Sequence, residues 1–193
     1  VRRDLPRAIA FVLNWSYLFF EQSYFINISR PPLLQHLWSL SVEEQFYVIW
    51  PIMLIGLYKL KLGNISPRVK IFFASAVLAI ASTSWMIYLS VTNGFPIPND
   101  PSRVYFGTDT HAIGLLVGCA AAALWRQDKL NERLTPDRAT AMNAIGLFSL
   151  AGLAYFFLFV SELNEFLYRG GFLVLSILTV TLVIVAAHPG LKF

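Results

Sequence analysis

Five long apolar stretches, separated by short polar segments, dominate the sequence: 46–60, 70–91, 112–125, 141–160 and 172–187. A helix that crosses a bilayer needs about 20 predominantly apolar residues. The second and fourth stretches reach this length by themselves, and the others reach it with flanking Trp, Tyr and polar residues. The segments lack the regular polar alternation of a membrane β-barrel. We therefore predict an all-α integral membrane protein, a polytopic helical bundle with five clear membrane helices.

A sixth apolar stretch, Leu5 to Phe20, is weaker because Asn14 interrupts it. A buried amide in lipid is costly unless it is hydrogen-bonded. The pattern leaves three alternatives open for this N-terminal segment: it spans the membrane, re-enters it, or lies in the interface. The same choice decides on which side of the membrane the neighbouring cations lie, namely Arg2, Arg3 and Arg7.

Composition supports a membrane protein and excludes other classes. Hydrophobic residues make up 56% of the chain, charged residues 13%, and the mean hydropathy is +0.60. Soluble domains carry about 25% charged residues, and disordered chains combine low hydrophobicity with high charge. The single cysteine excludes a disulfide framework and a cysteine-rich zinc site. The net charge of +4 does not indicate nucleic-acid binding, because the Lys and Arg residues are not clustered with aromatic residues on one face.

The basic residues instead predict a membrane topology. Segments 59–70 and 126–138 hold four Lys or Arg residues each, whereas 21–45, 92–111 and 161–171 hold one each. By the positive-inside rule, the two basic segments and the C-terminal end lie in the cytoplasm, and the other three segments lie outside. These sides alternate as five spanning helices require.

The ends of the chain predict that it is part of a longer protein. The sequence begins with Val1 rather than Met and carries no recognisable signal peptide, and it stops just after an apolar stretch. We expect residues 1–193 to be part of a single membrane domain that is truncated at both ends.

Candidate chemistry is concentrated in residues 36–47, which precede and enter the first long apolar stretch. If this segment is helical, His36, Ser39 and Glu43 share one face. A histidine and a carboxylate at this spacing suit proton transfer, because the acid can orient the imidazole and stabilise its charge. Ionisable groups at membrane depth are costly and tend to be functional.

Structural roles for the same residues remain open. Ser41-x-x-Glu44 before an apolar run is a capping-box pattern, in which case the helix starts at Ser41 and the shared face is lost. The aromatic residues Trp38, Tyr47 and Trp50 also fit an interfacial aromatic belt. For Glu43, in contrast, the sequence offers no role as a helix cap.

A second polar cluster lies at 105–112, on the same predicted outer side. Asp109 is a candidate N-cap. His111 then falls in the first helical turn, where the helix dipole disfavours its positive charge, so we expect a neutral imidazole. Together the two side chains suit binding of a sugar hydroxyl or orientation of a partner group. The three histidines are too far apart in the sequence to predict a metal site. The acidic residues at 162–165 are interpreted as a solvated loop.

Two stretches resemble signatures of a known family, the membrane acyltransferase family 3, whose members are bacterial O-acyltransferases of lipopolysaccharide, peptidoglycan and other envelope glycans. They are 35–47, QHLWSLSVEEQFY, followed by Trp50-Pro51, and 107–112, GTDTHA, followed by 115–118, LLVG. Asn14-Trp15 and Tyr24-Phe25 fit the segment before the first signature. Many members carry Arg where this chain has His111, a departure that changes the local charge.

The resemblance implies a membrane enzyme that moves an acyl group, commonly acetyl, from cytoplasmic acyl-CoA to an envelope glycan or similar hydroxyl acceptor. It implies the bacterial cytoplasmic membrane and acyl-CoA as donor substrate, with no bound cofactor. The family's essential histidine and its Arg-x-x-Arg motif match no position here, so we expect both before Val1. The residues carried over from the signatures are His36, Trp38, Ser39, Glu43, Glu44, Gln45, Phe46, Tyr47, Asp109 and His111.

Within this interpretation Glu43 and His36 are the candidate catalytic residues. Glu43 either couples to the missing histidine or acts on the acceptor hydroxyl, and His36 assists proton transfer. The candidate substrate-binding residues are Trp38, Ser39, Glu44, Gln45, Tyr47, Asp109 and His111. Two alternatives remain: a transporter, in which polar clusters at helix ends line a path, and a membrane scaffold without catalysis.

Overall fold

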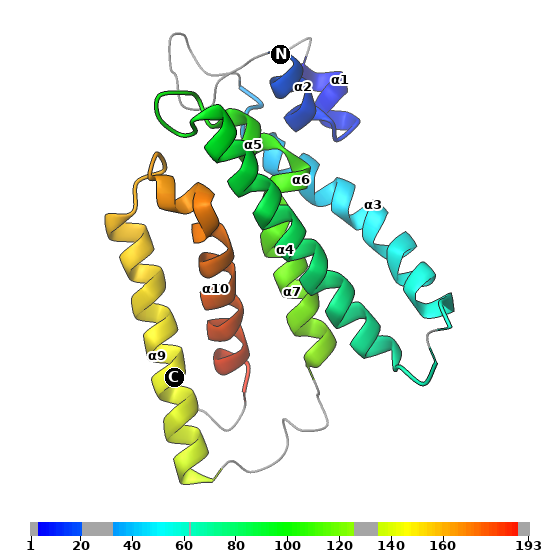
Figure 1. The fold of residues 1–193 in the computed structure, drawn as a ribbon, viewed down its shortest axis with the longest axis vertical. Helices are drawn as coiled ribbons and strands as arrows, with labels where there is room; N and C mark the ends of the chain where they lie inside the picture. The colour runs from blue at the N-terminus through cyan, green and yellow to red at the C-terminus, as the bar shows by residue number, and fades with distance from the viewer. Residues whose placement is uncertain (1–3, 21–32, 62, 126–134, 189–193) are drawn as a thin grey trace.

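The computed structural model describes residues 4–20, 33–61, 63–125 and 135–188, and within these ranges all regular structure is helical. Figure 1 shows an elongated bundle of long helices with several short helices gathered at one end. The elements are α1 (Asp4–Ile9), α2 (Leu13–Phe19), α3 (Leu37–Lys59), α4 (Pro67–Asn93), α5 (Ser102–Phe106), α6 (Thr108–His111), α7 (Ile113–Leu124), α9 (Pro136–Phe159), η1 (Leu167–Gly171) and α10 (Phe172–Ala186).

Among the described residues, four helical segments are long and apolar enough to cross a membrane: α3, α4, α9 and Leu167–Ala186, in which η1 and α10 are joined across a kink at Arg169 and Gly170. Four of the five predicted spans thus contain a helix of suitable length and composition, and the fifth does not. The stretch 112–125 forms α7, which has 12 residues. At 1.5 Å per residue it is about 18 Å long, well short of the roughly 30 Å hydrocarbon core. Figure 1 shows α7 packed lengthwise beside α4.

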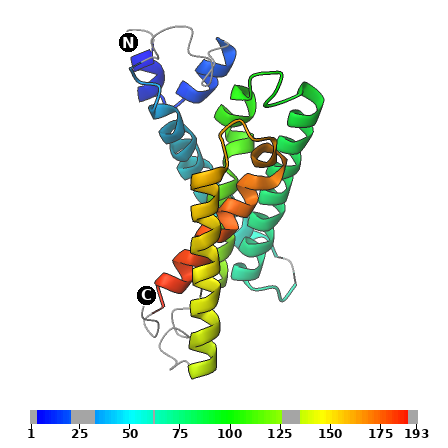
Figure 2. The same ribbon diagram turned by 90° about the vertical axis from the view of Figure 1, so that its left-hand side faces the viewer.

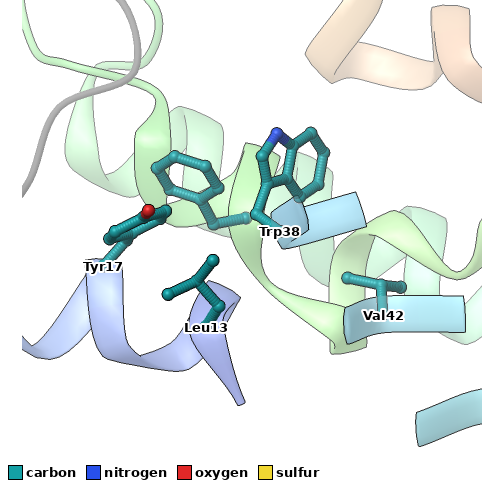
Figure 3. Close-up of a cluster of buried hydrophobic side chains, with 5 residues drawn as sticks. Leu13, Tyr17, Trp38 and Val42 are labelled. Atoms are coloured by element: carbon teal, nitrogen blue, oxygen red, sulfur yellow. The ribbon is translucent and has the colours of Figure 1, made fainter. Parts of the chain in front are cut away.

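The N-terminal segment does not form one spanning helix. It breaks into α1 and α2 at Phe11, whose positive φ of 53° is incompatible with a continuing right-handed helix. Figures 1 and 2 both show α1 and α2 at the same end of the bundle as α5. Leu13 and Tyr17 of α2 pack against Trp38 and Val42 of α3 in a buried cluster (Figure 3). Burial of this apolar face fixes α2 on the end of the bundle.

The long helices run alternately up and down, as the charge pattern predicts. Figure 1 places 94–101 and 160–166 at the end occupied by α1 and α2, and places 60–61, 63–66 and the last turn of α10 at the opposite end. Residues 1–3, 21–32 and 126–134 lie outside the described residues, so Arg2, Arg3 and part of two predicted loops are not placed.

Helix α4 shows how polar residues are accommodated in the bundle. Its buried face carries Ser75, Thr83 and Ser90, and each hydroxyl donates to a carbonyl one turn earlier in the same helix, at 2.7–2.8 Å. Because these hydroxyls are satisfied within α4, they need no partner on a neighbouring helix. Their small size leaves room for α7 to lie close to this face.

Candidate functional site

Helix α3 presents two chemically different faces. The helix begins at Leu37, and the Ser41 hydroxyl donates to the Leu37 carbonyl at 3.1 Å. Ser41 is therefore inside the helix, and the predicted capping box of Ser41 and Glu44 is wrong. Trp38 is buried and Gln45 faces α2, whereas His36 and Glu43 are exposed on the other side of the helix.

The inward face of α3 holds a closed hydrogen-bond network. The Gln45 Nε2 atom donates to the Phe11 carbonyl (2.7 Å) and to Asn14 Oδ1 (3.0 Å). Its Oε1 atom accepts from Trp15 Nε1 (3.1 Å) and from the Thr108 hydroxyl (2.6 Å). The amide thus uses both donors and both acceptor positions. Gln45 ties α3 to α2 and α6.

Asn14 completes this network from α2. Its side chain is fully buried, and its Nδ2 atom donates to the Phe106 carbonyl (3.0 Å) and to Thr108 Oγ1 (2.9 Å). The Thr108 hydroxyl therefore accepts from Asn14 and donates to Gln45. The polar residue that interrupts the N-terminal apolar stretch is the residue that positions α6.

The Asp109 carboxylate forms an ion pair with Arg103 and does not cap a helix. Arg103 donates to both carboxylate oxygens, at 3.1 and 2.7 Å, and Trp85 Nε1 donates to Oδ2 at 2.8 Å. The N-cap of α6 is Gly107, so the prediction that Asp109 caps the helix is wrong. The Arg103 guanidinium also lies 5.8 Å from the centre of the Trp15 ring. The cation thereby connects Asp109 to α2.

Gly107 gives this ion pair its space. A Cβ atom at this position would lie 2.3 Å from Arg103 Nη1 and 2.5 Å from Asp109 Oδ1. Burial would raise the pKa of the Asp109 carboxyl, but the hydrogen bonds and charge of Arg103, with the Trp85 N–H, outweigh that effect and lower it. Asp109 is therefore a carboxylate at neutral pH.

His111 ends α6 inside a cage of aromatic rings. Its ring centre lies 4.9 Å from Trp38, 5.5 Å from Tyr105 and 6.0 Å from Phe172. Burial among these rings lowers the pKa of His111 to about 4. The imidazole is neutral at pH 7, and among the described residues its nitrogens have no hydrogen-bond partner. They can accept from or donate to a ligand.

We expect His111 to make stability depend on pH. Between its ordinary pKa of 6.5 and about 4, the unfolded chain binds a proton that the folded protein does not. Stability should therefore rise as the pH increases from about 4 to 6.5, by about 2 kcal/mol after allowance for partial exposure of the ring. Thermal unfolding of the full-length protein in detergent across this range tests it. His111→Gln should flatten the dependence, and an unchanged slope would contradict this origin.

Two cavities flank α6. One, of about 410 Å³, lies between α3 and α4 and is almost entirely apolar, but Thr108, Asp109 and Ser82 contribute to its wall. The other, of about 610 Å³, lies between α9 and α10 and includes Tyr105 and Phe172, two rings of the cage around His111. Within the described residues, no three His, Cys, Asp or Glu side chains form a group that could hold a metal ion.

The structure brings four of the predicted site residues together: Trp38, Gln45, Asp109 and His111. It places the exposed residues His36, Glu43 and Tyr47 on the other face of α3. Ser39 is partly exposed and its hydroxyl lies 3.4 Å from the His36 carbonyl, and Glu44 is partly buried.

Sequence reasoning missed five residues that build this site: Asn14 and Thr108 in the network, with Trp15, Trp85 and Arg103. Four of them did carry a signal in the sequence. Asn14 is an amide in an apolar stretch, Trp15 and Thr108 lie in stretches that resemble the family, and Arg103 is the single cation of its segment.

Comparison with known proteins gives one consistent result. Residues 5–193 match the family model described as an acyltransferase domain. The chain is 39% identical over 189 residues to the peptidoglycan O-acetyltransferase OatA of Listeria monocytogenes, and 35% identical over 191 residues to the putative peptidoglycan O-acetyltransferase YrhL of Bacillus subtilis. It is 37% identical over 189 residues to a putative O-acetyltransferase of Staphylococcus aureus.

These alignments cover 98% of this chain in each case but 29%, 28% and 30% of the three relatives. The chain thus spans less than a third of the length of the relatives that it matches. No solved structure matches it.

Proposed function

Because the chain belongs to the acyltransferase domain family, we propose that its protein is a membrane O-acyltransferase that acylates a hydroxyl of a cell-envelope carbohydrate. The observation that carries the proposal is the family match, which covers residues 5–193 and so includes both polar clusters. The names of the relatives point to acetyl as the acyl group and to peptidoglycan as an acceptor class. The proposed donor is acyl-CoA.

The arrangement of the helices supports a place in the bacterial cytoplasmic membrane. Four segments suited to spanning and the up-and-down order fit a multi-pass protein. We propose that 59–70 and 126–138 face the cytoplasm and that 21–45, 92–111 and 161–171 lie outside. The end that carries Asp109 and His111 is then the outer end, where an envelope glycan is available.

The proposed chemistry needs a base beside an acceptor hydroxyl. The acceptor oxygen bonds to the acyl carbonyl carbon, the bond from that carbon to its carrier breaks, and the hydroxyl proton passes to the base. We assign the acid–base role to Glu43, acting on the hydroxyl or through a histidine, with His36 assisting proton transfer. We assign His111 to contact with the acceptor, and Asp109, whose carboxylate accepts from Arg103 and Trp85, to positioning of α6. Because both donors and both acceptor positions of the Gln45 amide are hydrogen-bonded within the protein, we assign Gln45 to positioning α6.

The test is transfer by the full-length protein in liposomes supplied with radiolabelled acetyl-CoA and an oligosaccharide of N-acetylglucosamine. We expect base-labile radiolabel on the sugar, formed only when acetyl-CoA is present. Palmitoyl-CoA in a parallel reaction decides whether longer acyl groups are accepted. Sugar uptake that does not depend on acyl-CoA would instead indicate a transporter, and no transfer under any condition would favour a scaffold.

A further inference from the structure

The cavity between α9 and α10 has walls unlike those of the cavity between α3 and α4. Five of its lining residues are aromatic, and one is a carboxylate, Glu162, in the turn that joins the two helices. The aromatic residues are Tyr105, Phe156, Phe157, Tyr168 and Phe172. With a volume of about 610 Å³, the cavity is in the size range of small-molecule sites. Figure 2 shows α10 crossing α9 obliquely.

The cavity has a carboxylate at its rim with spare hydrogen-bonding capacity. Among the described residues, the Glu162 carboxylate has no hydrogen-bond or ion-pair partner. Its backbone carbonyl, in contrast, accepts from the Tyr168 hydroxyl at 2.9 Å, which holds the turn against the cavity wall. The neighbouring carboxylate of Glu165 is neutralised by Arg169 at 2.8 Å and does not line the cavity. The turn is exposed, as the solvated loop predicted from the sequence requires, and only one of its two carboxylates is available to an occupant.

The cavity also lies next to His111, the residue assigned to contact with the acceptor. Tyr105 and Phe172 pack against the cavity on one side and against the His111 ring on the other. The cavity on the far side of α6 meets Thr108 and Asp109 instead. Helix α6 therefore stands between two cavities, an arrangement that suits a reaction with two substrates.

We propose that the cavity between α9 and α10 is the acceptor subsite and takes a hydroxylated sugar ring. This inference rests on the proposed function. Aromatic faces carry partial negative charge and attract the weakly positive C–H groups of a sugar ring. The Glu162 carboxylate accepts a hydrogen bond from a sugar hydroxyl, and its charge disfavours an anionic group at the rim. A ring bound there is separated from His111 by no more than the two shared aromatic side chains.

The turn itself provides a matched pair of variants for testing this subsite. Glu162→Gln and Glu165→Gln remove the same charge from the same turn, but only Glu162 lines the cavity. In the full-length protein we expect Glu162→Gln to raise the KM for the N-acetylglucosamine oligosaccharide roughly tenfold, the loss of one charge-assisted hydrogen bond. The kcat should change less than twofold, and Glu165→Gln should leave both constants unchanged. Equal effects of the two variants would overturn the assignment.

A second variant tests the aromatic wall without threatening the fold. Phe157 lines the cavity but is 94% exposed, so Phe157→Ala removes little buried surface. We expect it to raise the same KM, again with little change in kcat. Unchanged KM values in both Phe157→Ala and Glu162→Gln would place the acceptor elsewhere.

Direct binding separates this inference from the proposed function. Calorimetry of the full-length protein with the oligosaccharide, in the absence of acyl-CoA, should show binding that Glu162→Gln weakens, even if no transfer occurs. Tetramethylammonium is the competing probe, because aromatic rings and a carboxylate also suit a quaternary ammonium. Binding of that cation without binding of the sugar would overturn the sugar assignment and leave the acyltransferase proposal to the transfer assay.

Discussion

Replacing Glu43 with glutamine in the full-length protein is expected to lower the rate of acyl transfer by about 10²–10⁴-fold, the usual effect of removing a positioned acid–base group. Glutamine keeps the size of the side chain but can neither accept the hydroxyl proton nor stabilise a charged imidazole. In the described residues the Glu43 carboxylate is exposed and makes no hydrogen bond, so nothing in that part of the fold depends on it. The amount of protein in the membrane should be unchanged.

The conservative variant Glu43→Asp separates chemistry from folding. It retains the carboxylate on a shorter side chain, so it should recover part of the lost rate while melting at the same temperature as Glu43→Gln. The measurement is transfer of radiolabel from acetyl-CoA, normalised to the membrane level of each variant. Near-normal transfer by Glu43→Gln would contradict the acid–base role of Glu43. The face of α3 that carries Glu43 and His36 would then have no assigned catalytic residue.

The long helices could be predicted because lipid leaves an apolar run of about 20 residues little choice but to be helical. The same reasoning did not predict where the helices begin and end. Helix α3 starts at Leu37, well before the apolar stretch, and Gln45 in this polar part of the helix is hydrogen-bonded to Asn14 of α2 and Thr108 of α6. The stretch 112–125 looked like a span on composition, yet α7 has only 12 residues.

The candidate site was only partly predictable, because its contacts join residues far apart in the sequence. Asn14 and Thr108 are 94 residues apart, and Gln45 and Thr108 are 63 apart. A local pattern also gave a wrong prediction. Asp109 has the sequence context of a helix cap, but its carboxylate accepts hydrogen bonds from Arg103 and Trp85. The sequence did show which face of α3 shares His36 and Glu43, because that depends only on helical periodicity.

Asn14→Leu should cause the largest loss of stability of the substitutions considered. Leucine has a similar size but no hydrogen-bonding groups, so the buried Phe106 carbonyl and the partly buried Thr108 and Gln45 side chains each lose a partner. A buried polar group left without a partner costs about 1–3 kcal/mol. Because several are affected together, we expect a loss of about 3–5 kcal/mol and a lower thermal midpoint in detergent. Acyl transfer should fall as well, since α6 loses the contacts that orient Asp109 and His111.

The matched control is Asn93→Leu, the same replacement at the end of α4. Asn93 is exposed, and its amide donates to the Leu89 carbonyl one turn earlier in its own helix, which does not need that bond to stay folded. We expect a change of less than about 0.5 kcal/mol there. Equal melting of the two variants would mean that the Asn14 network does not hold α2, α3 and α6 together. A large loss at Asn14 alone would show that the end of the bundle bearing His111 is assembled around one buried amide.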